Sequence, residues 1–182
     1  MRIGVYCSAA SALPEKWIAD ARTFGVWIGK HGIELVYGGV NAGLMATIAD
    51  AAKSAGSKIV GVVPVRRFDC EWPHNDIRIP AADLCERKNT ILMLSDAFVV
   101  FPGGYGTLDE LISTFAHLNF TEQHKPLIVY NADGIFDPFM QQLNLFVEYG
   151  LMKAEALGLL QTVRTVDELT ETLEAIQKKG KK

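Results

Sequence analysis

Residues 98–110, FVVFPGGYGTLDE, decide the fold of this chain. The apolar run at 97–101 is typical of a buried β-strand, and it stops at a Pro-Gly-Gly turn. Helical character follows from Thr107 to about residue 119, with the acids Asp109 and Glu110 near its start. A strand, a glycine-rich turn and a helix in this order form one unit of an open α/β sheet.

The same alternation of short apolar runs and helical stretches continues over the whole chain. Strands are predicted at 2–7, 33–37, 58–63, 97–101 and 126–130, with a weaker one at 159–163. Helices are predicted at about 14–31, 43–56, 83–94, 107–119 and 136–149, with a last one from 166. The apolar runs are continuous, which is typical of strands covered on both faces. The sequence therefore predicts an α/β fold, a doubly wound parallel sheet with helices on both faces, in a single domain spanning 1–182.

Two segments depart from this pattern. Residues 64–82 hold three prolines and few periodic apolar positions, so they are predicted to be irregular, with one short strand at 76–79. An irregular segment of this length in a compact domain is often functional. Residues 177–182 include the sequence KKGKK and are predicted to form a flexible basic tail.

Composition and charge exclude several classes of partner. The chain has 49% hydrophobic and 21% charged residues and a formal net charge of −3, an ordinary globular balance. No basic field indicates nucleic acid or a membrane surface as a partner. No apolar run reaches the roughly 18 residues of a spanning helix, and the first strand is too short for a signal peptide.

Cysteine and histidine positions indicate neither a disulfide framework nor a metal site. The three cysteines are scattered, which fits reduced thiols in a cytoplasmic protein: Cys7, Cys70 and Cys85. The four histidines lack the spacing of a metal-ligand set: His31, His74, His117 and His124. The sequence predicts no metal and no cofactor.

Small residues follow three of the predicted strands, at the edge where an open parallel sheet binds its ligands. Glycine lets backbone N–H groups approach an anion without a Cβ between them. The helix that begins near Thr107 adds unpaired N–H groups and the positive end of its dipole. A phosphate is the expected ligand. Its candidate binding residues are Ser8, Gly38, Gly39, Gly43, Gly103, Gly104, Gly106 and Thr107.

These turns have other interpretations. Turns between strands and helices are often glycine-rich for packing alone. No Gly-Lys-Ser/Thr follows them, which excludes a Walker A loop, and no GxGxxG follows the first strand, which disfavours NAD. Tyr105 is expected at the mouth of the site or at an interface, although a tyrosine there could equally be packing.

Glu110 has two interpretations. In Thr107-Leu108-Asp109-Glu110 it fits a capping box, in which the Glu carboxylate accepts a bond from the N-cap amide. It could equally be a catalytic carboxylate that faces the ligand. Asp109 and Glu110 lie about 100° apart on a helix, so they are not expected to face one pocket together as a carboxylate dyad.

Arg87 and Lys88 lie on the helix before the glycine-rich turn. Arg87 falls on the apolar stripe of Leu84, Ile91 and Leu94 by i, i+3 and i, i+4 spacing. An arginine on an inward face needs an anionic partner, which a phosphate or a carboxylate at the neighbouring strand end would supply. Lys88 is interpreted as an anion binder, and the alternative is that both residues are ordinary surface charges.

The motifs resemble those of a known family. PGGYGTLDE (102–110), with the ERK element (86–88) before it, resembles the PGGxGTxxE signature of the LOG ("lonely guy") family. VYGGVNAGLM (36–45) is similar to the family's YGG-x-x-x-GLM turn, and the likeness extends from about residue 2 to 175. Members are cytokinin riboside 5′-monophosphate phosphoribohydrolases, often mislabelled lysine decarboxylases.

The resemblance implies a Rossmann-like fold, a homodimer and hydrolysis of the N-glycosidic bond of a nucleoside 5′-monophosphate to free base and ribose 5-phosphate. It implies catalytic roles for Arg87 and Glu110. It implies ligand binding by Lys88, Gly103, Gly104, Gly106 and Thr107. Two departures from the family pattern bear on the base: Leu84 replaces a common Met, and Val40-Asn41 replaces a more glycine-rich turn.

Several questions stay open at this point. A non-hydrolytic carrier of a phosphorylated cofactor, such as a molybdopterin carrier, could use the same turns, with Glu110 as a cap only. A nucleotide-sensing protein could use a dimer surface of Phe115, Leu118 and Phe120, unless these face the core. The preferred base, a second subunit's contribution to the site and the general acid are undetermined, with Asp83, Glu86 and water as options for the acid.

Overall fold

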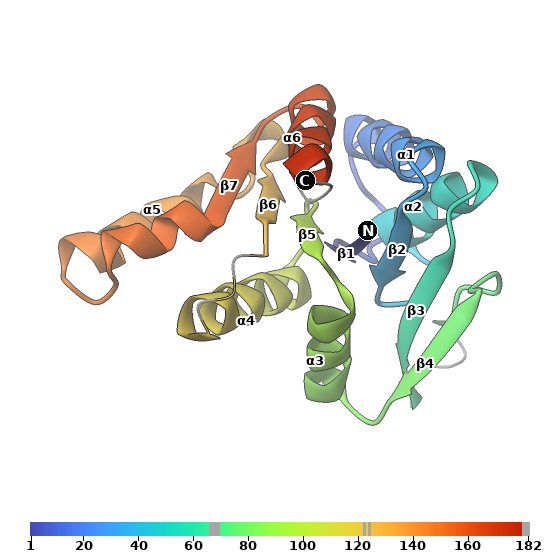
Figure 1. Cartoon of the computed structure of the whole chain (residues 1–182), viewed down its shortest axis with the longest axis horizontal. Coiled ribbons are helices and arrows are strands. Elements are labelled where there is room, and N and C mark those ends of the chain that lie inside the picture. The colour runs from blue at the N-terminus through green and yellow to red at the C-terminus, as the bar shows by residue number, and fades with distance from the viewer. Residues whose placement is uncertain (66–69, 122, 124, 180–182) are drawn as a thin grey trace.

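A seven-stranded parallel sheet forms the centre of the molecule, with the strand order β4-β3-β2-β1-β5-β6-β7 (Figure 1). The computed structural model describes residues 1–65, 70–121, 123 and 125–179. The strands are β1 (Arg2–Tyr6), β2 (Glu34–Tyr37), β3 (Ile59–Pro64), β4 (Ile77–Ala81), β5 (Ala97–Val100), β6 (Leu127–Tyr130) and β7 (Leu160–Val163). Every neighbouring pair in this order is parallel.

Helices cover both faces of the sheet because each strand carries apolar side chains on both sides. In β5, Val99 belongs to one apolar layer, and Phe98 and Val100 belong to the other. The first layer packs against α1 (Glu15–Lys30), α2 (Gly43–Ser54) and α6 (Val166–Lys179). The second packs against α3 (Leu84–Leu94), α4 (Tyr105–Thr121), α5 (Asp137–Glu148) and the short helix η3 (Ala154–Leu159), while η2 (Ala132–Gly134) follows β6. The predicted fold class, a Rossmann-like α/β domain, is confirmed.

The connection between β3 and β4 differs from the others because its described part contains a buried tryptophan where a crossover helix would lie. Its backbone bonds to the turn after β2: Trp72 N donates to Gly39 O at 2.8 Å, and Asn41 N donates to Cys70 O at 2.8 Å. The Trp72 side chain is buried in the layer of α1 and α2, and its indole donates to Asp50 on α2 at 2.8 Å. The strand expected at 76–79 is β4, which begins one residue later and ends two residues later than expected.

Several predicted boundaries differ from the structure by one or two residues, and two of the differences affect the site or the expected tail. Helix α4 begins at Tyr105 and not at Thr107, because Gly104 O already accepts the first helical bond from Leu108 N, at 3.0 Å. Helix α6 runs to Lys179, so residues 177–179 of the expected flexible tail are helical. Residues 180–182 lie outside the described residues.

Within the described ranges, no helix is long and apolar enough to cross a membrane. The same ranges hold no group of three or more His, Cys, Asp or Glu side chains placed to bind a metal ion. His124 lies outside them. Cys7 is buried, Cys70 is half-buried and Cys85 is exposed, and the structure contains no disulfide between them.

We predict that Trp72→Ala lowers the free energy of unfolding by about 3–5 kcal/mol, because it removes a large buried side chain and leaves a cavity beside α2. Urea denaturation measures the change. Tyr149→Ala is the matched control, since Tyr149 is exposed and its truncation should cost less than about 0.5 kcal/mol. Equal losses of unfolding free energy in the two variants would contradict the conclusion that Trp72 packs against α2 as part of the core.

Candidate active site

The sheet has a topological switch point between β1 and β5. From β1 the chain continues to β2 on one side of the sheet, and from β5 it continues to β6 on the other. Ligands of open α/β sheets bind outside the carboxyl ends of the strands at such a point. A cleft of about 400 Å³ lies there. Its walls are Cys7, Ser8, Ala9, Ala10, Met45, Leu84, Arg87, Lys88, Gly104, Tyr105, Gly106, Thr107, Asp109 and Glu110.

The loop after β1 forms one wall, and backbone bonds hold it on both sides. Ser8 N donates to Pro102 O at 3.1 Å, which ties this loop to the turn after β5. Ser8 O accepts from Leu44 N at 3.0 Å, and Ser8 Oγ accepts from Ala10 N at 3.0 Å. Gly43 packs directly against this loop and has a φ of 54°. A Cβ added to Gly43 would lie only 2.5 Å from Ala10 O, so a larger residue would collide with the loop.

The N-terminus of α4 forms the opposite wall. Gly104 and Gly106 line the cleft, and a Cβ at either position would meet no atom within 4 Å, so the two glycines leave open space for a ligand. The first N–H groups of a helix have no partner within it and carry the positive end of its dipole. This wall therefore suits an anionic group. Tyr105, 94% exposed, lies at its edge.

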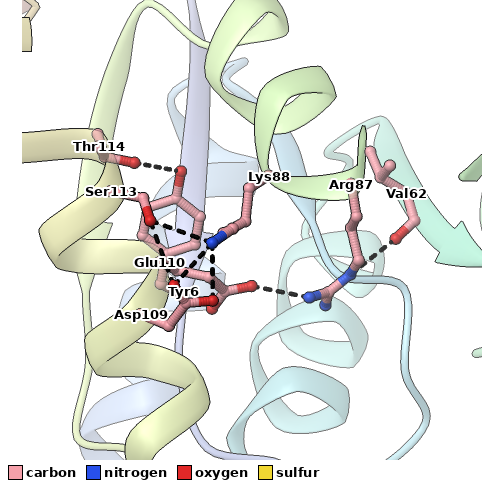
Figure 2. Close-up of polar contacts among 8 residues, drawn as sticks. All are labelled: Tyr6, Val62, Arg87, Lys88, Asp109, Glu110, Ser113 and Thr114. Atoms are coloured by element: carbon pink, nitrogen blue, oxygen red, sulfur yellow. Dashed lines mark hydrogen bonds and ion pairs between the residues drawn. The ribbon is translucent and has the colours of Figure 1, made fainter. Parts of the chain in front are cut away.

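A buried ion pair lies deeper in the cleft (Figure 2). Arg87 Nη1 on α3 donates to Glu110 Oε1 on α4 at 2.8 Å, and Arg87 Nε donates to the carbonyl of Val62 at the end of β3, at 3.1 Å. Arg87 is 8% exposed and Glu110 is 5% exposed. The prediction that Arg87 faces inward and needs an anionic partner is confirmed, and the partner is a carboxylate.

The position of Glu110 contradicts its interpretation as a capping residue. Because α4 begins at Tyr105, Thr107 lies inside the first turn and cannot be the N-cap. The Glu110 carboxylate points across to Arg87 and away from the start of its own helix (Figure 2). A related arrangement does exist one helix earlier, on α3, where the N-cap Asp83 accepts from Glu86 N at 2.8 Å and Glu86 accepts from the N–H of Ala82, the residue before the N-cap.

Burial governs the electrostatics around this carboxylate. It raises the pKa of Glu110 above its ordinary value, and the charge of Arg87 opposes that rise. Burial also raises the pKa values of the Tyr6 hydroxyl and the Cys7 thiol, so both are neutral at physiological pH. Tyr6 shares a hydrogen bond of 2.9 Å with Thr114. Glu110 is thus a carboxylate with raised proton affinity on the wall of a cleft, as a general base requires.

Lys88 is held by neighbouring side chains. Its Nζ lies 2.7 and 2.8 Å from the two carboxylate oxygens of Asp109 and 3.1 Å from Ser113 Oγ (Figure 2). Asp109 also lines the cleft, so the expectation that only one of the two acids reaches it is wrong. Its carboxylate is paired with Lys88, however, and the two acids do not form a dyad.

The structure brings eight of the predicted site residues to the cleft: Ser8, Arg87, Lys88, Gly104, Tyr105, Gly106, Thr107 and Glu110. Four predicted phosphate-binding glycines do not line it: Gly38, Gly39, Gly43 and Gly103. Gly103 packs against the Thr107 side chain, where a Cβ would lie 2.0 Å from Oγ1. Gly39 shapes the turn after β2, with a φ of 71°.

Some lining residues were missed by sequence reasoning. Ala9 and Ala10 belong to the small-residue loop that was singled out, but only Ser8 was named from it. Met45 and Leu84 supply apolar surface. Leu84 was expected to bear on the choice of base, whereas only proximity in the fold reveals the role of Met45. Asp83 and Glu86, considered as general acids, do not line the cleft. Of the proposed dimer surface, Phe115 and Leu118 are buried in the core, and only Phe120 is exposed, at 88%.

The fold and the cleft together define a doubly wound α/β protein with a site suited to an anionic ligand beside a buried carboxylate. A family model described as "Possible lysine decarboxylase" matches residues 45–173. The cytokinin riboside 5′-monophosphate phosphoribohydrolase LOG of Oryza sativa subsp. japonica is 32% identical over 176 residues, 95% of this chain and 72% of the rice protein. LOG5 of Arabidopsis thaliana, which has the same enzyme name, is 30% identical over 177 residues, 96% of this chain and 77% of that protein.

The chain belongs to this LOG-type family, as its motifs indicated. Among solved structures, the Moco carrier protein from Chlamydomonas reinhardtii matches with a TM-score of 0.74 at 23% identity, over 98% of both chains. The molybdenum cofactor binding protein from Rippkaea orientalis matches with a TM-score of 0.73 at 21% identity, over 96% of both chains. At these identities the likeness shows the shared fold alone.

We predict that Arg87→Met destabilises the protein by about 3–5 kcal/mol, because it leaves the Glu110 carboxylate buried without its counter-charge. The double variant Arg87→Met/Glu110→Leu should recover most of this loss, since it removes both charges. Urea unfolding at pH 7.5 measures both. A single variant within about 1 kcal/mol of the wild type would show that the pair is not a coupled unit.

The destabilisation by Arg87→Met should depend on pH. Burial places the folded-state pKa of Glu110 above its unfolded value, and loss of the Arg87 charge raises it further. Such a carboxyl favours the folded state below the unfolded pKa and loses this contribution as the pH rises through the folded pKa. The difference from wild type should therefore be small at pH 4.5 and grow toward pH 8. In Arg87→Met/Glu110→Gln residue 110 cannot titrate, so the stability of this variant should lack the loss between pH 4.5 and pH 8 that Arg87→Met shows.

Proposed function

We propose that the protein is a phosphoribohydrolase that cleaves the N-glycosidic bond of adenosine 5′-monophosphate or an N6-substituted relative. The products are the free base and ribose 5-phosphate. One observation carries the proposal: a buried carboxylate, Glu110, lines the same cleft as a helix N-terminus with open space in front of it. The names of the rice and Arabidopsis relatives support the same reaction.

The α4 N-terminus would bind the 5′-phosphate. Gly104 and Gly106 leave the first-turn N–H groups accessible, and Thr107 contributes a hydroxyl at the same turn. Lys88 would contribute less than its charge suggests, because Asp109 already neutralises it. Binding a dianion at this end would distinguish monophosphates from nucleosides and would supply binding energy for the reaction at C1′.

Glu110 would act at C1′ of the ribose. Cleavage of the C1′–N9 bond leaves positive charge on the sugar, an oxocarbenium-like state that a nearby carboxylate stabilises. The same carboxylate would take a proton from the attacking water as its oxygen bonds to C1′, and the departing base would gain a proton from solvent. Arg87 would orient Glu110 and keep it ionised between turnovers. Asp83 and Glu86 are engaged at the cap of α3, which leaves water as the proton source for the base.

A carrier function is the second candidate, because a carrier protein and a binding protein for the molybdenum cofactor share this fold. A carrier needs the anion-binding wall but has no use for a buried carboxylate with raised proton affinity. The ion pair of Arg87 and Glu110 therefore favours the enzyme. The lysine decarboxylase description of the family model fits the site poorly, since a pyridoxal enzyme needs a free lysine amine, whereas Lys88 is ion-paired with Asp109.

We further propose that the protein works as a homodimer in the cytoplasm. The relatives' activity on a small nucleotide requires no nucleic acid or membrane partner. Exposed apolar side chains at Leu84 and Tyr105, close to the cleft, would place a dimer contact near the site.

Glu110→Gln is expected to abolish base release, with kcat/KM falling by about 10² to 10⁴, because the amide neither stabilises the ribosyl cation nor accepts a proton. Chromatography of AMP and isopentenyladenosine monophosphate after incubation with each protein measures the free base. Glu148→Gln is the matched control, an exposed glutamate on α5 whose substitution should leave turnover unchanged. Circular dichroism checks that both variants fold.

The comparison has two informative failures. Unaltered turnover in a folded Glu110→Gln variant would refute the catalytic assignment. No base from either substrate with the wild-type protein would instead favour the carrier function, which equilibrium binding of the same nucleotides would then test.

Substitution at Gly104 tests the phosphate site. Gly104→Asp should raise the KM for AMP by about tenfold or more relative to Gly104→Asn, because the carboxylate repels the substrate phosphate at the helix N-terminus. The two side chains are nearly isosteric, and a Cβ at this position meets no neighbour, so packing effects cancel. Steady-state kinetics at 0.05 and 0.5 M salt should show the difference shrinking at high salt. Equal KM values would place the phosphate elsewhere.

A further inference from the structure

We infer that Gly38 is a positioning residue for Arg87: the missing side chain at Gly38 leaves the space in which the guanidinium lies, and so holds it against Glu110. Gly38 was expected to bind phosphate, but it does not line the cleft. The inference rests on the proposed function only for its effect on turnover. Its structural part concerns the ion pair itself.

The space beside the Gly38 Cα is occupied by a single side chain, that of Arg87. A Cβ built on Gly38 would lie 1.4 Å from Arg87 Nη2, 2.5 Å from Cζ and 3.1 Å from Nε. These three nearest atoms all belong to the guanidinium. Gly38 does not have a positive φ, whereas the adjacent Gly39 does, at 71°. Alanine is therefore compatible with the backbone at position 38, and its collision is with Arg87.

Arg87 cannot move aside without losing bonds. Its Nε is bonded to Val62 O at 3.1 Å and its Nη1 to Glu110 at 2.8 Å, and the guanidinium is planar, so the direction of Nη2 is determined by the other two nitrogens. The side chain is 8% exposed, so most of its surface already contacts other protein atoms. The end of β2, the end of β3 and helix α4 thus define one position for the cation.

A side chain at position 38 would separate the cation from the carboxylate. A displacement of about 1 Å in a catalytic constellation costs about 100-fold in rate. We therefore expect Gly38→Ala to lower kcat for AMP by about 100-fold with little change in KM, since the phosphate wall on α4 is untouched. A rise in KM at constant kcat would mean that Gly38 contacts the ligand and would overturn the inference.

Two glycine variants serve as matched controls for the activity measurement. Gly158→Ala adds the same methyl group in η3 at an exposed position with no neighbour within 4 Å, and it should change neither activity nor stability. Gly61→Ala adds it on β3, 2.5 Å from Asn75 Oδ1, which mimics a side-chain collision away from the cleft. It should lower stability while kcat of the folded protein stays within about twofold of wild type.

A double-mutant comparison tests the inference without any activity. In the wild-type background Gly38→Ala should lower the Tm by about 4 °C or more. In an Arg87→Ala/Glu110→Gln background, where no guanidinium occupies the space and no buried charge lacks a partner, it should leave the Tm unchanged. An equal loss in both backgrounds would show a purely local role for Gly38 and would overturn the inference.

Carbon-13 NMR of the Glu110 carboxyl measures the pKa of this group in the folded protein. A general loss of stability would not change that pKa. The charged and titratable groups that act on Glu110 are Arg87 and Lys88 on α3, Asp109 on α4, and Tyr6 and Cys7 at the end of β1. Of these, Gly38→Ala displaces Arg87. The pKa of Glu110 should then rise relative to the wild type, because the carboxylate loses the nearby positive charge, and an unchanged pKa would contradict the inference. If the wild-type protein releases no base, the proposed function fails while these two measurements still decide the role of Gly38.

Discussion

The buried ion pair of Arg87 and Glu110 is the interaction on which the rest of the site depends. Two charges that are 8% and 5% exposed are unfavourable unless their bonding groups are satisfied. The fold supplies what they need from separate places in the sequence. Helix α3 provides the arginine, the end of β3 provides a carbonyl for Nε, and α4 provides the carboxylate. The parallel sheet makes this possible because the carboxyl ends of its strands meet at one edge.

Two different electrostatic interactions are found in separate parts of the cleft, one suited to an anion and one suited to a cation. At the N-terminus of α4 the backbone presents N–H groups and a dipole, which attract an anion without a charged side chain. Glu110 of the ion pair lines the same cleft, and in the reaction that we propose its carboxylate would stabilise the positive charge that develops on the ribose. A second ion pair, Lys88 with Asp109, neutralises itself at the rim. A protein with the same fold but without the buried carboxylate would keep the anion-binding wall and lose the group to which we assign catalysis.

The fold and part of the site could be predicted from the sequence, and the errors have identifiable causes. The strand at 97–101, its glycine-rich turn and the inward-facing Arg87 were predicted correctly because each depends on local pattern. The capping interpretation of Glu110 failed because α4 starts two residues earlier than the pattern indicates, and a helix start depends on a single carbonyl bond. Gly38 and Gly103 were interpreted as ligand contacts because a glycine in a turn has the same appearance whether it faces a ligand or another side chain.

The sequence by itself determined the class of fold, the edge of the sheet that carries the site and the residue types found there. These follow from hydrophobic periodicity and turn chemistry, which act over a few residues. Only the tertiary structure decided which groups pair: Arg87 with Glu110, Lys88 with Asp109, and Gly38 with the guanidinium. The two members of these pairs lie 23, 21 and 49 residues apart along the chain, respectively. Pairing at that separation depends on how strands and helices pack around the switch point, and no local pattern encodes that packing.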